Sequence, residues 1–267
     1  MFAASGSRVA DGTRTRDRRD HNPELYQLSY AHQARRSIAA FGGARPGVVD
    51  ASGVSWEARG AMLHLTFDDG PDPVWTPAVL DALAGAGARA TFFVLGERAA
   101  AHPAIVERML AAGHGVEAHG HGHLRHPATA RECVEGDLAA ALVVLGGLGI
   151  APKLWRAPWG DLAPWSGEVA AANGQTLAGW TADTNDWRGG GAKSMLAAVK
   201  PLLRPGAVVL AHDGLGPGAL RTDCAETVAL IRPLVDAGRQ RGLEPVPLEP
   251  RPDLPAGNAD LGLGAPA

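Results

Sequence analysis

Short apolar runs alternate with helical patterns from residue 61 to residue 250. The runs are four or five residues long and are typical of strands buried in a parallel sheet. They lie at Leu63–Phe67, Ala90–Val94, Gly115–Ala118, Lys153–Arg156, Thr176–Trp180, Ala207–Leu210 and Leu243–Val246. Between them, apolar positions recur at helical spacing and predict six helices. These cover Thr76–Ala86, Ala101–Ala112, Arg131–Gly147, Ser166–Asn173, Ala192–Leu203 and Ala225–Arg241.

This alternation predicts an α/β fold in a single domain. Strands that alternate with helices pair in parallel, and seven strands favour a parallel (β/α) barrel with one unit fewer than eight. The chain is 46% hydrophobic, which is enough for one sizeable core. An open doubly wound sheet is the alternative fold. No G-x-G-x-x-G follows the first strand, which argues against dinucleotide binding.

The two ends of the chain differ from this regular part. Residues 1–45 hold 8 Arg, no Lys and only 4 acidic residues, and residues 1–60 show no sustained period. We expect residues 1–60 to form a basic, disordered leader. A start site assigned too far upstream is the alternative. The tail, residues 251–267, is rich in Pro, Gly and Ala and is also expected to be disordered.

Composition argues against several classes of protein. The net charge of −3 disfavours nucleic acid as a partner, because phosphate binding needs a basic face. Two cysteines, Cys133 and Cys224, are too few for a disulfide scaffold. No apolar run of about 18 residues predicts a membrane span. Residues 1–60 lack the apolar core of a secretory signal peptide, so the sequence as written favours a cytoplasmic location.

Polar side chains gather directly after the predicted strands. In a parallel barrel these positions all fall on the C-terminal rim, where barrel enzymes keep their sites. They are Asp68 and Asp69 after the first strand, His119, His121 and His123 after the third, Arg156 at the end of the fourth, Asp183 and Asp186 after the fifth, and His212 after the sixth.

A metal site is predicted from two of these groups. His119 and His123 are four residues apart, which on a helical turn puts both rings on one side. Asp68 and Asp69 are adjacent and point in different directions, so one can bind metal while the other faces a substrate. Two histidines and one carboxylate leave a coordination position open, as in catalytic sites. Alone, Asp-Asp-Gly would be a turn and the histidines a solvated loop; their shared rim favours metal binding.

Other polar and aromatic residues on the rim have two readings each. His212 at a strand end is structural in many proteins, but beside a metal site it becomes a candidate general acid. Arg156 would either form a surface ion pair or orient the nearby carboxylates. Trp155, Trp159 and Trp187 would either fill the core or form walls that stack on a sugar.

Five short motifs together resemble the polysaccharide deacetylase family, carbohydrate esterase family 4, over about residues 61–250. In order they are TFDDG at 66–70, H-x-x-x-H at 119–123, RAPWG at 156–160, DTNDW at 183–187 and LAH at 210–212. The resemblance implies a distorted (β/α) barrel and a bound divalent metal. It also implies a hydrolase that removes the N-acetyl group from an N-acetylated amino sugar in a poly- or oligosaccharide.

The resemblance implies a role for each rim residue. Asp69, His119 and His123 would be the metal ligands. Asp68 would be the general base, and His212 the general acid that protonates the departing amine. Zinc is the expected ion, with cobalt, nickel or another divalent ion as alternatives.

The remaining roles implied by the resemblance are supporting ones. Arg156 would hold Asp68 by an ion pair, and Asp186, together with Asp183, would tune His212. The backbone N–H of Trp159 would help to stabilise the oxyanion. The residues expected to contact substrate are Trp159, Trp187 and Leu210.

The sequence also departs from the usual family pattern. The histidine motif reads HGHGH, with an extra His121 and two glycines where bulkier residues are common. Trp159 stands where tyrosine is frequent, and a glycine-rich loop, residues 214–218, follows the acid. These differences leave substrate identity open. The alternatives are an N-formyl amino sugar on a lipid carrier, a cyclic amide, or an inert carbohydrate-binding relative.

Overall fold

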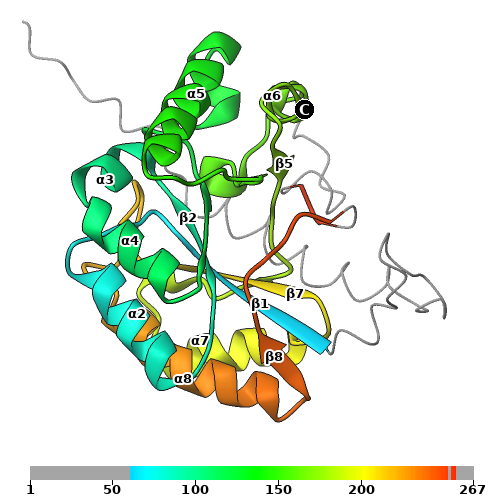
Figure 1. Cartoon of the computed structure of the whole chain (residues 1–267). Helices are drawn as coiled ribbons and strands as arrows, with labels where there is room; N and C mark the ends of the chain where they lie inside the picture. The colour runs from blue at the N-terminus through cyan, green and yellow to red at the C-terminus, as the bar shows by residue number, and fades with distance from the viewer. Residues whose placement is uncertain (1–60, 252–253, 257–267) are drawn as a thin grey trace, which may run out of the picture.

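The computed structural model describes residues 61–251 and 254–256. The expected leader, residues 1–60, and most of the expected tail lie outside the described residues. Eight parallel strands form one sheet that curls into an open barrel (Figure 1). They are β1 (Ala61–Asp68), β2 (Thr91–Val94), β3 (Gly115–Ala118), β4 (Leu154–Trp155), β5 (Thr176–Leu177), β6 (Ala182–Asp183), β7 (Ala207–His212) and β8 (Leu243–Pro245).

The strand order confirms the expected parallel α/β barrel. The sheet runs β5-β4-β3-β2-β1-β7-β6, and β8 pairs with the first residues of β1. Among the described residues no ladder joins β5 to β6, so the barrel stays open between these two short strands. β1 is therefore central, with β7 along one side and β8 and then β2 along the other.

Helices surround the sheet on its outer side, and α2, α7 and α8 lie together below β1 and β7 in Figure 1. The helices are α2 (Trp75–Gly85), α3 (Gly96–Ala101), α4 (Pro103–Ala111), α5 (Arg131–Gly147), α6 (Ser166–Ala172), α7 (Ala192–Val199) and α8 (Ala225–Arg239). Four 3₁₀ turns complete the described part: η3 (His126–Ala128), η4 (Pro158–Gly160), η5 (Asp186–Arg188) and η6 (Lys200–Leu202).

Two elements differ from the sequence-based expectation. The helix expected at Ala101–Ala112 is α4, which starts at Pro103, and a further short helix that the sequence did not indicate, α3, lies before it; the two are separate because the residue before a proline disfavours helical geometry. β6 was not expected, since two residues are too few to show a period.

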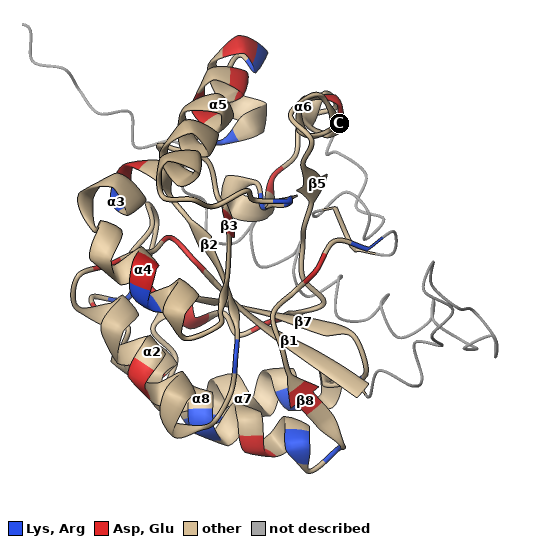
Figure 2. Ribbon diagram, viewed as in Figure 1, with Lys and Arg blue, Asp and Glu red and all other residues tan. Residues whose placement is uncertain are grey.

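Side chains of the central strands alternate between two cores. Leu65 and Phe67 of β1 and Val209 of β7 face the outer helices in the main core. Val208 and Leu210 face the barrel interior in a smaller cluster with Phe93, Leu154, Ala178, Trp180, Leu248 and Leu254. In Figure 2 the ribbons of β1 and β7 are almost entirely tan, while charged residues lie on covering helices such as α5 and α8.

The start of the expected tail packs against the barrel. Leu254 is buried in the interior cluster, and the carbonyl of Pro255 accepts a hydrogen bond from the amide of Gly179. Arg251 donates to the carbonyl of Gly206 at 2.7 Å. A single apolar anchor among Pro, Gly and Ala residues carries no periodic signal, so composition alone did not indicate this contact.

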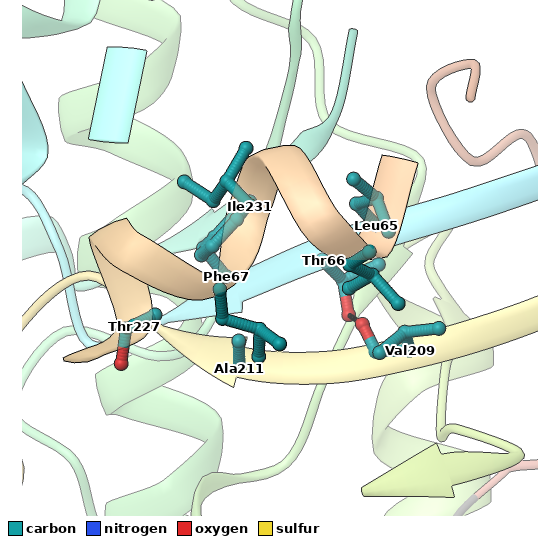
Figure 3. Close-up of a pocket in the computed structure, with 9 residues that line it drawn as sticks. Leu65, Thr66, Phe67, Val209, Ala211, Thr227 and Ile231 are labelled. Carbon is teal, nitrogen blue, oxygen red and sulfur yellow. Dashed lines mark hydrogen bonds between the residues drawn. The ribbon is translucent and has the colours of Figure 1, made fainter. Parts of the chain in front are cut away.

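A small cavity lies between β1, β7 and α8 (Figure 3). Its lining includes Leu65, Phe67, Ala211 and Ile231, which are apolar. Its volume of about 10 Å³ has room for no more than one water molecule, so it is a packing defect and not a substrate site. None of the helices in the described part of the chain has the length and apolarity needed to cross a bilayer.

Candidate active site

The register of the two central strands brings Asp68 beside His212. The β1–β7 ladder pairs these two residues directly, at the C-terminal end of both strands. Asp68 lies two residues beyond Thr66, and His212 lies two residues beyond Leu210. Because alternate side chains of a strand lie on the same face, both Asp68 and His212 face the barrel interior. Neighbouring strands are about 4.8 Å apart, which fixes the separation of the two backbones.

Asp69 follows the strand in an unusual backbone conformation. Its φ of 75° is rare for a residue with a side chain. Nη1 of Arg98, from α3, donates to the carbonyl of Asp69 at 2.7 Å, and Nη2 donates to Leu215 at 3.0 Å. Arg98 therefore holds the Asp69 turn against the glycine-rich loop.

The glycine-rich loop packs closely on Asp69. A Cβ on Gly216 would lie 2.2 Å from Oδ2 of Asp69, and a Cβ on Gly214 would lie 2.8 Å from its carbonyl oxygen. Such distances exclude any side chain at these two positions without a shift. The glycines noted in the sequence thus permit the loop to cover the Asp69 carboxylate.

Asp69 and two histidines converge on one point. Oδ1 of Asp69 lies 3.5 Å from Nε2 of His119 and 3.2 Å from Nε2 of His123. One ligand atom of each residue lies within 4.8 Å of the other two. The expected helical turn is wrong: residues 119–123 form an irregular bend, with φ of 85° at Gly120 and 57° at His123.

The donor set fits a cation. The carbonyl of Arg156 can only accept, so Nδ1 of His119, 2.9 Å away, carries the proton and Nε2 presents a lone pair to Asp69. Oδ1 of Asp69 is buried with no hydrogen-bond partner. A lone pair facing a buried carboxylate is stabilised by a metal ion between them.

Arg156 lies inside the barrel and holds Asp68. Its Nη1 donates to Oδ1 of Asp68 and to the hydroxyl of Thr66, both at 2.8 Å. Its other donors reach the carbonyls of Ala178 and Gly179 at 3.0 and 2.9 Å. The guanidinium also lies 4.0 Å from the centre of the Phe93 ring. Because Oδ1 is occupied, Oδ2 of Asp68 is left facing the cluster, 3.9 Å from Nε2 of His119.

His212 is oriented by Asp186. Oδ1 of Asp186 lies 2.7 Å from Nδ1 of His212, and Oδ2 accepts the backbone N–H of the same residue at 2.9 Å. Burial alone would lower the pKa of His212, but the Asp186 carboxylate outweighs it and raises the pKa to about 10. With Nδ1 bound, the Nε2 proton of the imidazolium is the one available for transfer.

Family relationship follows from comparison with known proteins. The sequence profile of the polysaccharide deacetylase family matches residues 57–178. A chitooligosaccharide deacetylase of Bradyrhizobium is 37% identical over 199 residues, which are 70% of this chain and 88% of that relative. This chain belongs to the polysaccharide deacetylase family.

Two further relatives of this polysaccharide deacetylase agree. A peptidoglycan-N-acetylglucosamine deacetylase of Bacillus cereus is 32% identical over 193 residues, 71% of this chain and 88% of the relative. The solved structure of a family 4 carbohydrate esterase from Streptomyces lividans, in complex with acetate, matches with a TM-score of 0.63 and 30% identity. That match covers 69% of this chain and 91% of the esterase chain.

The aromatic residues expected at the rim of the polysaccharide deacetylase have different surroundings. Trp159 has φ of 64° and its ring lies 5.3 Å from that of His123, edge to face. Trp187 is partly exposed in η5, and its carbonyl accepts the backbone N–H of Leu220 at 2.8 Å. Trp155 is 1% exposed and belongs to the core. Leu210 is 4% exposed in the interior cluster, so its contact with substrate stays a prediction.

Asp183 makes its side-chain hydrogen bond within its own turn and none to His212. Its Oδ1 accepts the backbone N–H of Asn185 at 2.7 Å, and its Oδ2 is buried with no hydrogen-bond partner. Burial raises its pKa to about 6. Direct contact with His212 is therefore made by Asp186, and the expected tuning of His212 by Asp183 stays a prediction.

Sequence reasoning missed Arg221 and Thr227, which complete the surroundings of Asp186. Arg221 Nη1 donates to Oδ2 of Asp186 at 2.8 Å, and its Nη2 donates to the carbonyls of His212 and Gly214 at 3.0 and 3.1 Å. The hydroxyl of Thr227 donates to the same Oδ2 at 2.7 Å. Arg221 lies in an irregular loop 35 residues from Asp186, and no local pattern indicates the pair.

Arg221→Met is expected to lower the free energy of unfolding by about 3 kcal/mol, because breaking a buried ion pair leaves one charge uncompensated. Arg221 and Asp186 are both buried, with side chains 6% and 1% exposed. Urea denaturation measures the change. Arg232→Met, which removes an exposed pair on α8, is the control and should shift stability by less than about 1 kcal/mol. Equal effects of the two substitutions would contradict the prediction.

Proposed function

We propose that this chain removes the N-acetyl group from N-acetylated amino sugars in poly- or oligosaccharides, with one divalent metal ion, zinc. The observation that carries the proposal is the position of Asp68. One of its oxygens is fixed by Arg156, and the other faces the cluster of Asp69, His119 and His123. The two curated relatives described above are deacetylases of chitooligosaccharides and of peptidoglycan N-acetylglucosamine, which supports this substrate class.

We assign the metal to Asp69, His119 and His123. When bound, a divalent ion supplies a Lewis acid that polarises the acyl carbonyl oxygen. Zinc suits a set of two imidazoles and one carboxylate that leaves a coordination position open. The tautomer of His119, fixed by the Arg156 carbonyl, supports this assignment because it presents Nε2 unprotonated.

Asp68 acts as the general base. Its Oδ2 takes the proton from the water that attacks the acyl carbon, while Oδ1 remains bound to Arg156. The ion pair with Arg156 places a cation beside the Asp68 carboxylate within a buried site. Arg156 is anchored by two further carbonyls and so fixes the direction of the base.

His212 acts as the general acid from the neighbouring strand. An amine is a poor leaving group unless its nitrogen is protonated, and the imidazolium donates the Nε2 proton to that nitrogen as the C–N bond breaks. Asp186 stabilises the imidazolium and sets its orientation. The backbone N–H of Trp159 would stabilise the negative oxygen of the tetrahedral intermediate, and the rings of Trp159 and Trp187 would contact the sugar.

The activity is tested by product analysis on the zinc-loaded protein. N-acetylated chitooligosaccharides are expected to release acetate and free amine in equal amounts, and a chelator should abolish the release. N-formyl amino sugars and cyclic amides are assayed in parallel. Faster turnover of either compound would reassign the substrate, and no turnover of any compound by zinc-loaded protein would contradict the proposal.

The metal assignment makes a separate prediction. Asp69→Asn and His123→Ala should each weaken zinc binding more than about 100-fold, because losing a ligand costs more than the 10–100-fold typical of losing a residue behind the ligands. Isothermal titration with zinc measures this. His121→Ala is the matched control, since it removes a histidine of the same segment that lies outside the cluster. Equal binding by all three variants would show that the metal is held elsewhere.

A further inference from the structure

The segment that carries both histidines has no regular structure of its own. Residues 119–123 contain two glycines, and two of the five residues have positive φ angles. An irregular, glycine-containing segment loses much conformational entropy when it is fixed in one shape. Some contact outside the segment must therefore select the conformation in which His119 and His123 face Asp69.

Asp137, in the middle of α5, makes that contact. Its Oδ2 accepts the backbone N–H of His121 at 2.7 Å, and its Oδ1 accepts the backbone N–H of Gly122 at 2.7 Å. Each oxygen of the carboxylate is thus used once, by successive amides of the histidine segment. Successive amides that converge on an anion form a nest, and hydrogen bonds to an ionised acceptor are stronger than neutral ones.

The opposite edge of the segment is also held. The backbone amide of Gly96, at the start of α3, donates to the carbonyl of Gly120 at 2.9 Å, and that of Glu97 donates to His121 at 3.3 Å. α3 and α5 pack against each other. The segment is therefore held between two helices: α3 bonds to its carbonyl groups, and Asp137 of α5 bonds to its amide groups.

Gly120 is matched to Asp137. Its φ of 85° favours glycine, and a Cβ at this position would lie 2.6 Å from Oδ2 of Asp137. The unusual glycine of the HGHGH motif thus has two separate reasons to be glycine. One of them exists only because the carboxylate of Asp137 approaches so closely.

We propose that Asp137 is a positioning residue for the metal site, which fixes His119 and His123 toward Asp69 before the metal binds. The proposal rests on the assignment of the metal to those three residues. Asp137 acts through the amides of His121 and Gly122 and does not itself touch the metal. Without Asp137 the three ligand residues are still present, but the histidine segment becomes ordered only when the metal binds. The conformational entropy lost in that ordering weakens metal binding.

The test is zinc affinity, measured by competition with a chromophoric chelator. Asp137→Asn keeps the shape of the side chain but can accept only one of the two N–H groups, so we expect about 10-fold weaker binding. Asp137→Ala removes both bonds and should weaken binding by up to about 100-fold, the range for residues that support metal ligands. Glu132→Gln, at an exposed position of the same helix, is the control and should bind like the wild type.

Two further readouts separate positioning from a general structural role. The visible spectrum of the cobalt-loaded Asp137→Asn protein should change in intensity, because the ligand geometry is less fixed, whereas the cobalt spectrum of Glu132→Gln should not. Gly120→Ala should weaken zinc binding less in the Asp137→Ala background than in the wild type, since the clash with Oδ2 is then absent. This double-mutant cycle of Gly120→Ala and Asp137→Ala also tests the proposal through a second residue.

Zinc affinity of Asp137→Asn within about twofold of the wild type, at a lowered melting temperature, would show that Asp137 only supports the fold. Additive effects of Gly120→Ala and Asp137→Ala would also overturn the proposal. If His123→Ala itself bound zinc normally, the metal assignment would fail instead. The two failures are therefore distinguishable.

Discussion

Asp68→Asn is expected to reduce kcat by about 10²–10⁴-fold on an N-acetylated chitooligosaccharide, the usual contribution of a general base. The amide oxygen of asparagine can still accept the hydrogen bond from Arg156, so the site keeps its shape. The other atom of the amide is a donor and cannot take a proton from water. Zinc binding should remain within a few-fold of the wild type, because Asp68 is not one of the three clustered ligands.

The control for this substitution has to address stability. Arg156 is buried, and the loss of the carboxylate partner of a buried charge costs about 3–5 kcal/mol in general. Three other acceptors of Arg156 remain, the Thr66 hydroxyl and two carbonyls, which reduces this cost. Kinetics should be measured well below the melting temperature of the variant, beside Asp81→Asn on the exposed face of α2. More than a tenth of wild-type kcat in a folded, zinc-loaded Asp68→Asn protein would assign the base elsewhere.

His212→Ala is expected to show a defect that depends on the leaving group. The amine of an N-acetyl sugar must be protonated as it departs, so kcat on that substrate should fall about 10²–10⁴-fold. A nitrophenolate leaves without protonation, so hydrolysis of a nitrophenyl acetate should fall far less. The ratio of the two losses is the measurement, because a merely structural defect would reduce both rates alike. Equal losses would mean that His212 only packs the rim and another group protonates the amine.

The pH profile provides a second test of His212. Its folded-state pKa is raised from the usual 6.5 to about 10, so the ring is charged at neutral pH and the acid is lost only as pH rises through the raised value. A bound divalent cation opposes this rise, so the alkaline limb of kcat is expected between 6.5 and about 10. The Asp186 partnership also stabilises the fold; this contribution is complete below pH 6.5 and is lost as pH rises toward about 10. The wild-type alkaline limb should appear with the N-acetyl sugar and be absent with the nitrophenyl ester, whose leaving group does not need the acid.

Much of the fold could be predicted because the pattern is local. The longer strands are short, mainly apolar runs, and polar residues of the site stand at or just beyond the ends of these runs. Asp68, Asp69 and His212 could therefore be placed on one rim from the sequence. The five motifs then implied individual roles, which stay predictions until the variants are measured.

The remainder depends on contacts between distant segments. Asp137 and Arg221 are 15–16 and 35 residues from the groups that they bind, and a single charged residue in a helix or loop carries no sign of its partner. The two histidines do not lie on a helical turn, because their four-residue spacing is also compatible with an irregular bend that brings both rings to one side. In this structure, glycine conformation and the carboxylate of Asp137 determine that bend.

The direct pairing of Asp68 and His212 across one ladder has a consequence for inhibitor design. The two groups are carried by backbone that cannot move apart without breaking the central pair of strands, so the gap that a transition-state mimic must span is set by the sheet. A zinc-binding warhead shaped to that gap would act on any relative that keeps the same pair. Selectivity for this chain has to come from inhibitor atoms that extend toward Trp159 and the loop that bears Gly214 and Gly216. At these two places the sequence departs from the usual family pattern.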